Sequence, residues 1–323
     1  MISRRNLAIG ICGSMLASSM SNAQGVPRAS ELMFVIPAAA GGSADISGRL
    51  LARGITSIQT TPIIISNRSA GQGIEGTLYV FNSPVNSGNV LVGGPNGLFF
   101  APARENLPYN ADSFDPVCMF SMAAFVLVTR VDNFNNIDEL MIAMQTRRIN
   151  FAFSAADGRY LIDRFVKHVN ARDTVAVSYR GGGEAVRDVF SGVVDVAITS
   201  LASVAGGIQS GTLRLLAHTL DSGNVAAYPN LPGLSDVLQN RDPALTSFHW
   251  HGLYLPKGSP QNLNRFLQNA ARMIYEDSTF VAEHISRGMI PRYMNPDQLR
   301  EHHVKMEVYM IGYNNWIREV GSL

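Results

Sequence analysis

The residues best suited to bind a ligand come directly after a short apolar, strand-like segment, residues 32–36. Small side chains let a ligand approach the main chain there, and a helical pattern begins at residue 45. The first N–H groups of a helix have no internal partner, and the helix dipole favours negative charge beside them. The turn therefore predicts an anion-binding site. Its candidate ligand-binding residues are Ala39, Ala40, Gly41, Gly42, Ser43 and Asp45.

Four further turns of small or polar residues come at the ends of predicted strands, at 93–97, 154–158, 179–183 and 199–200. In α/β sheets, ligands bind outside the carboxyl ends of the strands. Turns that meet at one crevice would therefore line a cleft with backbone donors and hydroxyl groups. A guanidinium group beside such a cleft suits a carboxylate. The candidate ligand-binding residues of these turns are Asn96, Ser154, Asp157, Tyr179, Arg180, Gly181, Gly182 and Ser200.

The sequence predicts no catalytic residue, no metal ligand and no cofactor. It contains neither G-x-S-x-G nor H-E-x-x-H. His249 and His251 share one face of a predicted strand, and imidazole is a common metal ligand. No Cys, Asp or Glu lies close in sequence to complete a metal site, so we expect two partly buried histidines. Helix capping explains Asp45 and Glu184 without a ligand.

The composition indicates a compact globular protein. The 323 residues are 46% hydrophobic and 16% charged, and the formal net charge of +1 comes without a basic block, which argues against a nucleic-acid partner. Residues 1–23 read as an export signal, with two arginines, a short apolar core and small residues before the cleavage site. Both the general and the twin-arginine secretion routes stay open. We expect a soluble, monomeric periplasmic protein with Cys118 buried among apolar residues.

Strand-like apolar runs alternate with helical patterns, which predicts α/β layers with mainly parallel sheets. The predicted strands are 32–36, 62–66, 89–93, 124–130, 149–153, 174–178, 193–199, 213–219 and 249–255. The predicted helices are 45–58, 74–82, 136–146, 159–170, 184–191, 201–210, 260–276, 278–287 and 296–318. Residues 220–247 read as a long surface connection, and His302 and His303 as surface residues of the last helix.

Two strand-like segments, 125–128 and 252–255, lie far apart in the sequence and each precedes a turn. If they pair as neighbouring crossovers, the chain passes from one domain into a second and returns. We therefore expect domain 1 to contain residues 24–123 and 253–323, and domain 2 to contain residues 124–252. The two crossovers would then form a hinge.

An ordered series of motifs covers the chain from end to end. The matching segments, with some substitutions, are 37–45 for P-x-x-x-G-G-x-x-D, 64–76 for V-V-x-N-R-P-G-A-G-G-x-x-G, 107–117 for L-P-Y-x-x-x-x-F-x-P-V, 179–195 for Y-K-G-x-x-x-A-x-x-D-x-x-x-G-x-V-D, 200–203 for S-L-A-S, 211–217 for G-K-L-R-x-L-A and 250–260 for W-x-G-x-x-x-P-x-G-T-P. By these motifs the chain resembles the periplasmic solute-binding receptors of tripartite tricarboxylate transporters, also called the Bug family. The G-x-G-x-x-G at 71–76 then belongs to the family pattern and not to a dinucleotide site.

The resemblance implies an α/β protein of two-domain hinged periplasmic-binding-protein (type II) architecture, each domain a mainly parallel sheet flanked by helices. It also implies that the turns at 39–45 and 179–183 hold a ligand carboxylate through backbone N–H groups and ordered water. The chain departs from the family at Ala38, Ser69 and Arg180, where an aromatic residue, a proline and a lysine are usual, and it lacks a histidine in the segment 156–161. These departures bear on which ligand is bound.

We expect an exported, non-enzymatic receptor that captures a small organic carboxylate and presents it to membrane permease subunits. Two alternatives stay open. A sensor-type protein would present the same complex to a signalling receptor. An enzyme on the same scaffold would use Asp45 or Asp157 with His251. The sequence does not identify the carboxylate.

Overall fold

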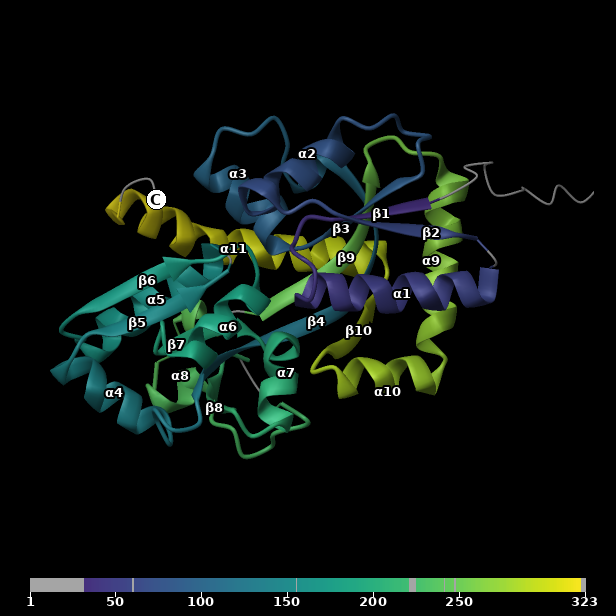
Figure 1. The fold of residues 1–323 in the computed structure, drawn as a ribbon. Coiled ribbons are helices and arrows are strands. Elements are labelled where there is room, and N and C mark those ends of the chain that lie inside the picture. Colours follow the sequence, from purple (N-terminus) through teal and green to yellow (C-terminus); the bar gives the residue numbers. More distant parts are fainter. Residues whose placement is uncertain are drawn as a thin grey trace, which may run out of the picture.

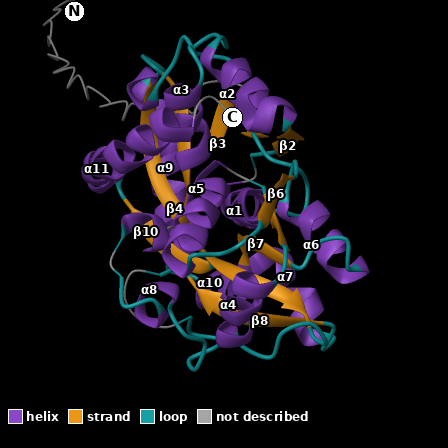
Figure 2. Ribbon diagram, turned by 90° about the vertical axis from the view of Figure 1, so that its left-hand side faces the viewer, coloured by secondary structure: helices purple, strands orange, loops and turns teal. Residues whose placement is uncertain are grey.

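A computed structural model describes residues 32–320, except 60, 155, 221–224, 241 and 247. The predicted export signal, residues 1–23, lies outside the described residues. Within the described part of the chain, no helix is both long enough and apolar enough to span a bilayer. The described elements form two sheets flanked by helices (Figures 1 and 2).

The first sheet is mixed. Its strands, in spatial order, are β2 (Ile63–Asn67), β1 (Leu32–Ile36), β3 (Asn89–Gly93), β9 (Phe248–Pro256), β4 (Phe114–Arg130) and β10 (Ile290–Met294). β2, β1 and β3 are parallel, whereas β9, β4 and β10 pair antiparallel. α1 (Ser43–Gln59) packs on one face and α2 (Ile74–Phe81) on the other, so this sheet is buried on both sides (Figure 1).

The second sheet is mixed in the same way. Its strands, in spatial order, are β6 (Thr174–Ser178), β5 (Ile149–Phe153), β7 (Val196–Ser200), β4 and β8 (Leu213–His218). β6, β5 and β7 are parallel, and β4 runs antiparallel to β7 and β8. Separate clusters of buried apolar residues lie on its two faces. The predicted α/β fold with sheets flanked by helices is thus confirmed. The expectation of mainly parallel sheets was wrong, because β9 enters the first sheet and β4 enters both sheets as antiparallel strands: β3 pairs antiparallel with β9, and β4 pairs antiparallel with β9, β10, β7 and β8.

The remaining helices lie in the connections between strands and at the end of the described chain. They are α3 (Ala101–Arg104), α4 (Ile137–Thr146), α5 (Ala156–Val169), α6 (Gly182–Ser191), α7 (Leu201–Gln209), α8 (Leu234–Val237), α9 (Gln261–Tyr275), α10 (Ser278–Ser286) and α11 (Pro296–Val320). The predicted apolar face of α9 is the face that packs on the first sheet, with Leu263, Leu267 and Ala270 buried. Most predicted helices and strands agree with the structure to within three residues.

β4 connects the two sheets. It pairs with β9 up to Ala124 and then with β7 from Phe125 onward. β4 and β9 are neighbours, as the hinge hypothesis requires, but residues 252–255 lie opposite 115–119 and not opposite 125–128. The division into two domains at 123/124 and 252/253 stays a proposal, with β4 as the element that passes between the sheets.

α11 makes a further connection between the sheets, since it runs from the first sheet to α5 of the second (Figure 1). Trp316 donates a hydrogen bond from its indole nitrogen to Asp163, at 3.1 Å. Tyr160 of α5 packs against Tyr313 and Trp316 with ring centroids 5.5 and 5.2 Å apart. α11 therefore belongs to the packing of both sheets.

Two sequence predictions of local structure were wrong, and three short elements, β10, α3 and α8, were not predicted. β4 begins ten residues earlier than predicted, because Pro116 interrupts the apolar pattern and is accommodated at a shift in register. The region 220–247 is not only a surface connection, because Leu234, Ala244 and Leu245 are buried in it.

Candidate ligand-binding site

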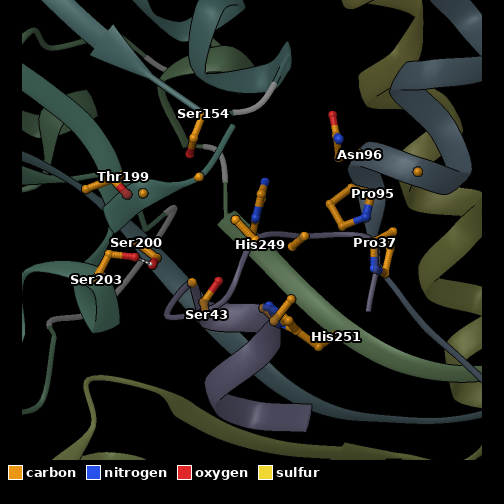
Figure 3. A pocket seen from close by; sticks show the side chains of 18 of the residues that line it. Pro37, Ser43, Pro95, Asn96, Ser154, Thr199, Ser200, Ser203, His249 and His251 are labelled. Atoms are coloured by element: carbon orange, nitrogen blue, oxygen red, sulfur yellow. Dashed lines mark hydrogen bonds between the residues drawn. The ribbon is translucent and has the colours of Figure 1, made fainter. Parts of the chain in front are cut away.

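A cavity lies between the two sheets, over the strand β9 (Figure 3). It contains about 810 Å³ of empty space, part of it open to solvent. The turns after β1, β3, β5 and β6 and the end of β7 all contribute to its wall, so the five turns selected in the sequence meet at one place. Of the candidate residues, those that line it are Ala39, Gly42, Ser43, Asn96, Ser154, Arg180, Gly181, Gly182 and Ser200.

The glycine turns of the two sheets touch each other. A methyl group added at Gly181 would lie only 2.9 Å from the Cβ atom of Ala39. Gly182 is equally confined, because a methyl group there would lie 2.4 Å from the Thr199 hydroxyl oxygen and 2.6 Å from that of Ser203. The turn that opens α1 and the turn that opens α6 thus face one shared gap.

Backbone donors from both turns border this gap. Ser43 and Ala44 stand in the first turn of α1 and Gly182 in the first turn of α6, and all three residues line the cavity. Among the described residues, none accepts a hydrogen bond from the amide groups of these three residues. Helix dipoles add positive potential at the same ends. The arrangement can hold an anion with donors from both sheets.

Asp45 supports the first turn and does not line the cavity. Its carboxylate is 6% exposed and accepts hydrogen bonds from the Gly41 amide at 3.0 Å, Arg49 Nε at 2.8 Å and Asn67 Nδ2 at 2.9 Å. Asn67 also donates to the Ala38 carbonyl. Burial acts to raise the pKa of Asp45, but the three hydrogen bonds outweigh it and hold that pKa below its usual value. Asp45 is therefore an ionised support for the turn.

We expect Asp45→Ala to lower the free energy of unfolding by about 2 kcal/mol, because the turn and α1 lose three hydrogen bonds to one buried carboxylate. Amide hydrogen exchange should become faster at Gly41, whose N–H loses its partner. The control is Asp277→Ala, which removes a single helix-capping bond to the Thr279 amide at the start of α10. That variant should lose about 1 kcal/mol and leave exchange at Gly41 unchanged. Unchanged exchange at Gly41 in Asp45→Ala would contradict the assignment.

Asp157 lies behind the cavity wall. It is fully buried, and its carboxylate oxygen Oδ2 lies 2.9 Å from His249 Nε2. The other oxygen accepts the Gly158 amide at 3.0 Å. The contact ties the start of α5 to β9, across 92 positions of sequence.

Asn96 lines the cavity and bridges elements of the two sheets. Its Oδ1 accepts the amide of Ala156, which opens α5, at 3.4 Å, and its Nδ2 donates to the Gln72 carbonyl at 2.8 Å. The Gln72 side chain in turn donates to the Ser178 hydroxyl at 3.3 Å. The two bonds that cross between the sheets, to Ala156 and to Ser178, are the long ones and fit a contact that can open and close.

The remaining candidate residues lie at the edge of the cavity or outside it. Tyr179 does not line the cavity. Its hydroxyl donates a hydrogen bond to Asp188 of α6 at 2.6 Å. Ala40 and Gly41 are exposed, and Ala40 lines a groove on the outer side of the contact between the turns. Arg180 lines the cavity, but its side chain is 79% exposed and lies 3.5 Å from Glu184.

Sequence reasoning missed the floor of the cavity. β9 lines it with Trp250, His249 and His251. Figure 3 shows the two histidines together with side chains from several turns. The rings of His249 and His251 lie on one face of the strand, as predicted, with centroids 6.5 Å apart. Within the described ranges, no group of three or more His, Cys, Asp or Glu side chains could hold a metal ion. The only available signal was the shared strand face of the two histidines.

Comparison with known proteins identifies the family. A family model described as the tripartite tricarboxylate transporter family receptor matches residues 48–309, which run from α1 to α11. The chain belongs to this family. The BugT protein of Bordetella pertussis is 26% identical over 280 residues, which cover 83% of each chain. The family resemblance inferred from the ordered motifs is confirmed.

Solved structures of similar proteins share the fold of this chain. An R. palustris protein solved with adipate superimposes with a TM-score of 0.77 at 21% identity, covering 88% of this chain and 95% of that one. MatC from Rhodopseudomonas palustris, solved with bound malate, gives a TM-score of 0.72 at 20% identity, covering 81% and 90%. At these identities the likeness establishes the architecture.

Proposed function

We propose that the protein is an exported receptor that captures a small organic carboxylate in the cavity between its two sheets. The observation that carries the proposal is the convergence of free amide groups from α1 and α6 on one gap. Family membership and the two relatives solved with malate and adipate support a carboxylate as the anion. We further propose that the complex is presented in the periplasm to permease subunits of a tripartite transporter.

The mechanism rests on contacts with both sheets. A ligand can favour a closed form only if it binds that form better than the open one. In the closed arrangement, the carboxylate would receive hydrogen bonds from the amides of Ser43 and Ala44 on one side and from the amide of Gly182 on the other. In the open arrangement the hydrogen bonds of one side are lost. The ligand therefore acts as a bridge, with β4 and β9 as the strands that bend.

Two measurements test the proposal. Mass spectrometry of the native protein should reveal a retained carboxylate, and calorimetry after unfolding and refolding should detect saturable binding within a panel of mono-, di- and tricarboxylates of three to eight carbons. The amines and sugars of matched size in the same panel should not bind. If the refolded, cooperatively melting protein binds no carboxylate, the proposal fails. Chemical turnover of a bound carboxylate would instead favour an enzyme.

Arg180 should contribute little to affinity despite its position after β6. An exposed cation paired with a neighbouring acid gains only a small electrostatic energy. We expect Arg180→Gln to weaken carboxylate binding by less than about fivefold. Calorimetry at low and moderate salt measures this directly. A loss of a hundredfold or more would mean that the side chain turns inward and contacts the ligand.

A further inference from the structure

α11 carries an exposed apolar stripe on its outer face. The buried residues of its inner face are Leu299, Met310, Tyr313 and Trp316. A helix that packs on one face is normally polar on the other. Instead, Val304, Val308 and Ile311 are 60%, 68% and 62% exposed, and they are three of the five most exposed large apolar side chains among the described residues. A contiguous apolar stripe of this kind indicates a surface that another molecule covers.

The stripe has the spacing of a coiled-coil seam. Val304, Val308 and Ile311 follow one another at intervals of four and three residues, and the exposed Asn315 continues the series after four more. Residues at these intervals lie along one side of a helix and pack against a second helix with the same pattern. A polar Asn within such a seam restricts the ways in which the two helices can pair. The expected partner of the stripe is therefore another α-helix.

The seam is complementary to itself when two copies of α11 run antiparallel. A two-fold axis halfway along the stripe places Val308 opposite Ile311 of the second copy. The same axis places Val304 opposite Asn315 of the second copy. One contact would therefore cover the apolar stripe of both copies.

Charges at the two ends of the stripe favour this orientation. Glu301 and Arg318 are exposed and continue the seam by one further interval of three residues at either end. In the antiparallel pair, Glu301 of each copy lies opposite Arg318 of the other, so two ion pairs would form. In a parallel pair, each of these residues would instead face its own copy. Like charges repel, so the parallel arrangement is disfavoured.

The position of α11 leaves the ligand site free. Figure 2 shows α11 at one margin of the molecule and α6, whose first turn borders the cavity, at the other. None of the described residues that line the cavity belongs to α11. Two copies can therefore meet through α11 while the cavity of each stays open to its ligand.

We propose that the outer face of α11 is the docking surface for a second copy of this chain, in an antiparallel, two-fold symmetric dimer. The proposal departs from the monomer expected from the sequence and adds to the proposed function. A seam from residue 301 to residue 318 is about 25 Å long, and one helix pair of that length buries less than the roughly 1,200 Å² of a stable complex. The dimer should therefore be reversible, with a Kd on the order of 10–100 µM.

Analytical ultracentrifugation of the protein from about 1 µM to about 1 mM tests the proposal and should show a reversible monomer–dimer equilibrium. Ile311→Glu places a charge against Val308 of the second copy and should weaken the dimer about tenfold or more. Ile142→Glu is the matched control, because Ile142 is 64% exposed and lies on α4. This variant should associate like the wild-type protein.

Exchange of the end charges tests the orientation. Glu301→Arg and Arg318→Glu each replace both ion pairs by like-charge contacts, and each should weaken the dimer about tenfold. The variant that combines them restores opposite charges across the axis and should return to within about threefold of the wild-type Kd. A parallel pair would show no such recovery. All the substituted residues are exposed, and thermal unfolding reports whether each variant is folded.

The outcomes decide the proposal without touching the receptor function. A wild-type protein that stays monomeric up to about 1 mM would leave the stripe to a different partner and overturn the inference. A dimer that persists unchanged in Ile311→Glu, or that weakens equally in Ile142→Glu, would overturn it as well, and so would a lack of recovery in the charge-exchanged variant. Carboxylate binding by Ile311→Glu should equal that of the wild-type protein, so loss of the dimer and loss of ligand capture are measured separately.

Discussion

Gly181→Ala should weaken carboxylate binding about tenfold to a hundredfold while changing the stability of the unliganded protein by less than about 1 kcal/mol. The added methyl group would lie 2.9 Å from the Cβ atom of Ala39, which belongs to the other glycine turn. Neither atom is the end of a flexible side chain, so the two turns must move apart. The backbone itself causes no strain, because φ at Gly181 is −170° and any residue adopts that value.

The chain offers a matched control and a rescue for this prediction. Gly183→Ala places the same methyl group in the same turn, where nothing lies within 4 Å, and should leave affinity nearly unchanged. Ala39→Gly removes the atom that the new methyl group meets, so the double variant should recover most of the lost affinity. Calorimetry with the tightest ligand of the carboxylate panel, arranged as a double-mutant cycle, measures the coupling. Equal losses in Gly181→Ala and in the double variant would refute closure onto this contact.

The site could be predicted from the sequence where it depends on local backbone geometry. A strand, small residues and the start of a helix follow one another at 32–45 and again at 174–185, and each turn then lies at the carboxyl end of its strand. The roles of individual side chains in these turns were harder to predict. Asp45 has the residue type of a ligand contact, yet three neighbouring donors occupy its carboxylate.

The parts that could not be predicted depend on packing between distant segments. His249 reaches Asp157 across 92 positions of sequence, and β9 becomes the floor of the cavity only because it pairs with β3 and β4. His302 and His303 are likewise half-buried and not fully exposed on the surface. Both rings pack against Trp250, with centroids 5.4 and 5.5 Å away. No sequence pattern within α11 predicts that contact, because the contact depends on where α11 crosses the first sheet.

The packing of these histidines has a large expected effect on stability. Burial is the main cause that lowers the pKa of His302 and His303 to about 4 and that of His251 to about 3, and it also lowers the pKa of His218 and His284. In the unfolded chain each has an ordinary pKa of about 6.5. Between these values the unfolded chain binds more protons than the folded protein. The free energy of unfolding is therefore highest above about pH 6.5 and decreases as the pH drops toward 4.

The free energy of unfolding should decrease by about 1.4 kcal/mol per pH unit for each histidine that takes up its proton only on unfolding. Because several histidines act together, calorimetric unfolding at pH 7, 6 and 5 should show a steep fall in melting temperature. His303→Gln removes one of them, a ring that stacks on Tyr254 with Nε2 2.9 Å from its hydroxyl oxygen. Its pH dependence should be flatter by about one proton, even if its stability at pH 7 is lower.

His168→Gln is the matched control, because His168 is exposed on α5 and its ring lies 3.0 Å from the Asn240 side-chain nitrogen. It should keep the wild-type slope of melting temperature against pH. If His303→Gln and His168→Gln lose stability on acidification as steeply as each other, His303 already carries its proton in the folded protein. The contact of α11 with Trp250 and Tyr254 would then be more open to water than the structure indicates. A flatter slope in His303→Gln alone would instead show that a tightly packed interface keeps this ring neutral, beside the strand that forms the cavity floor.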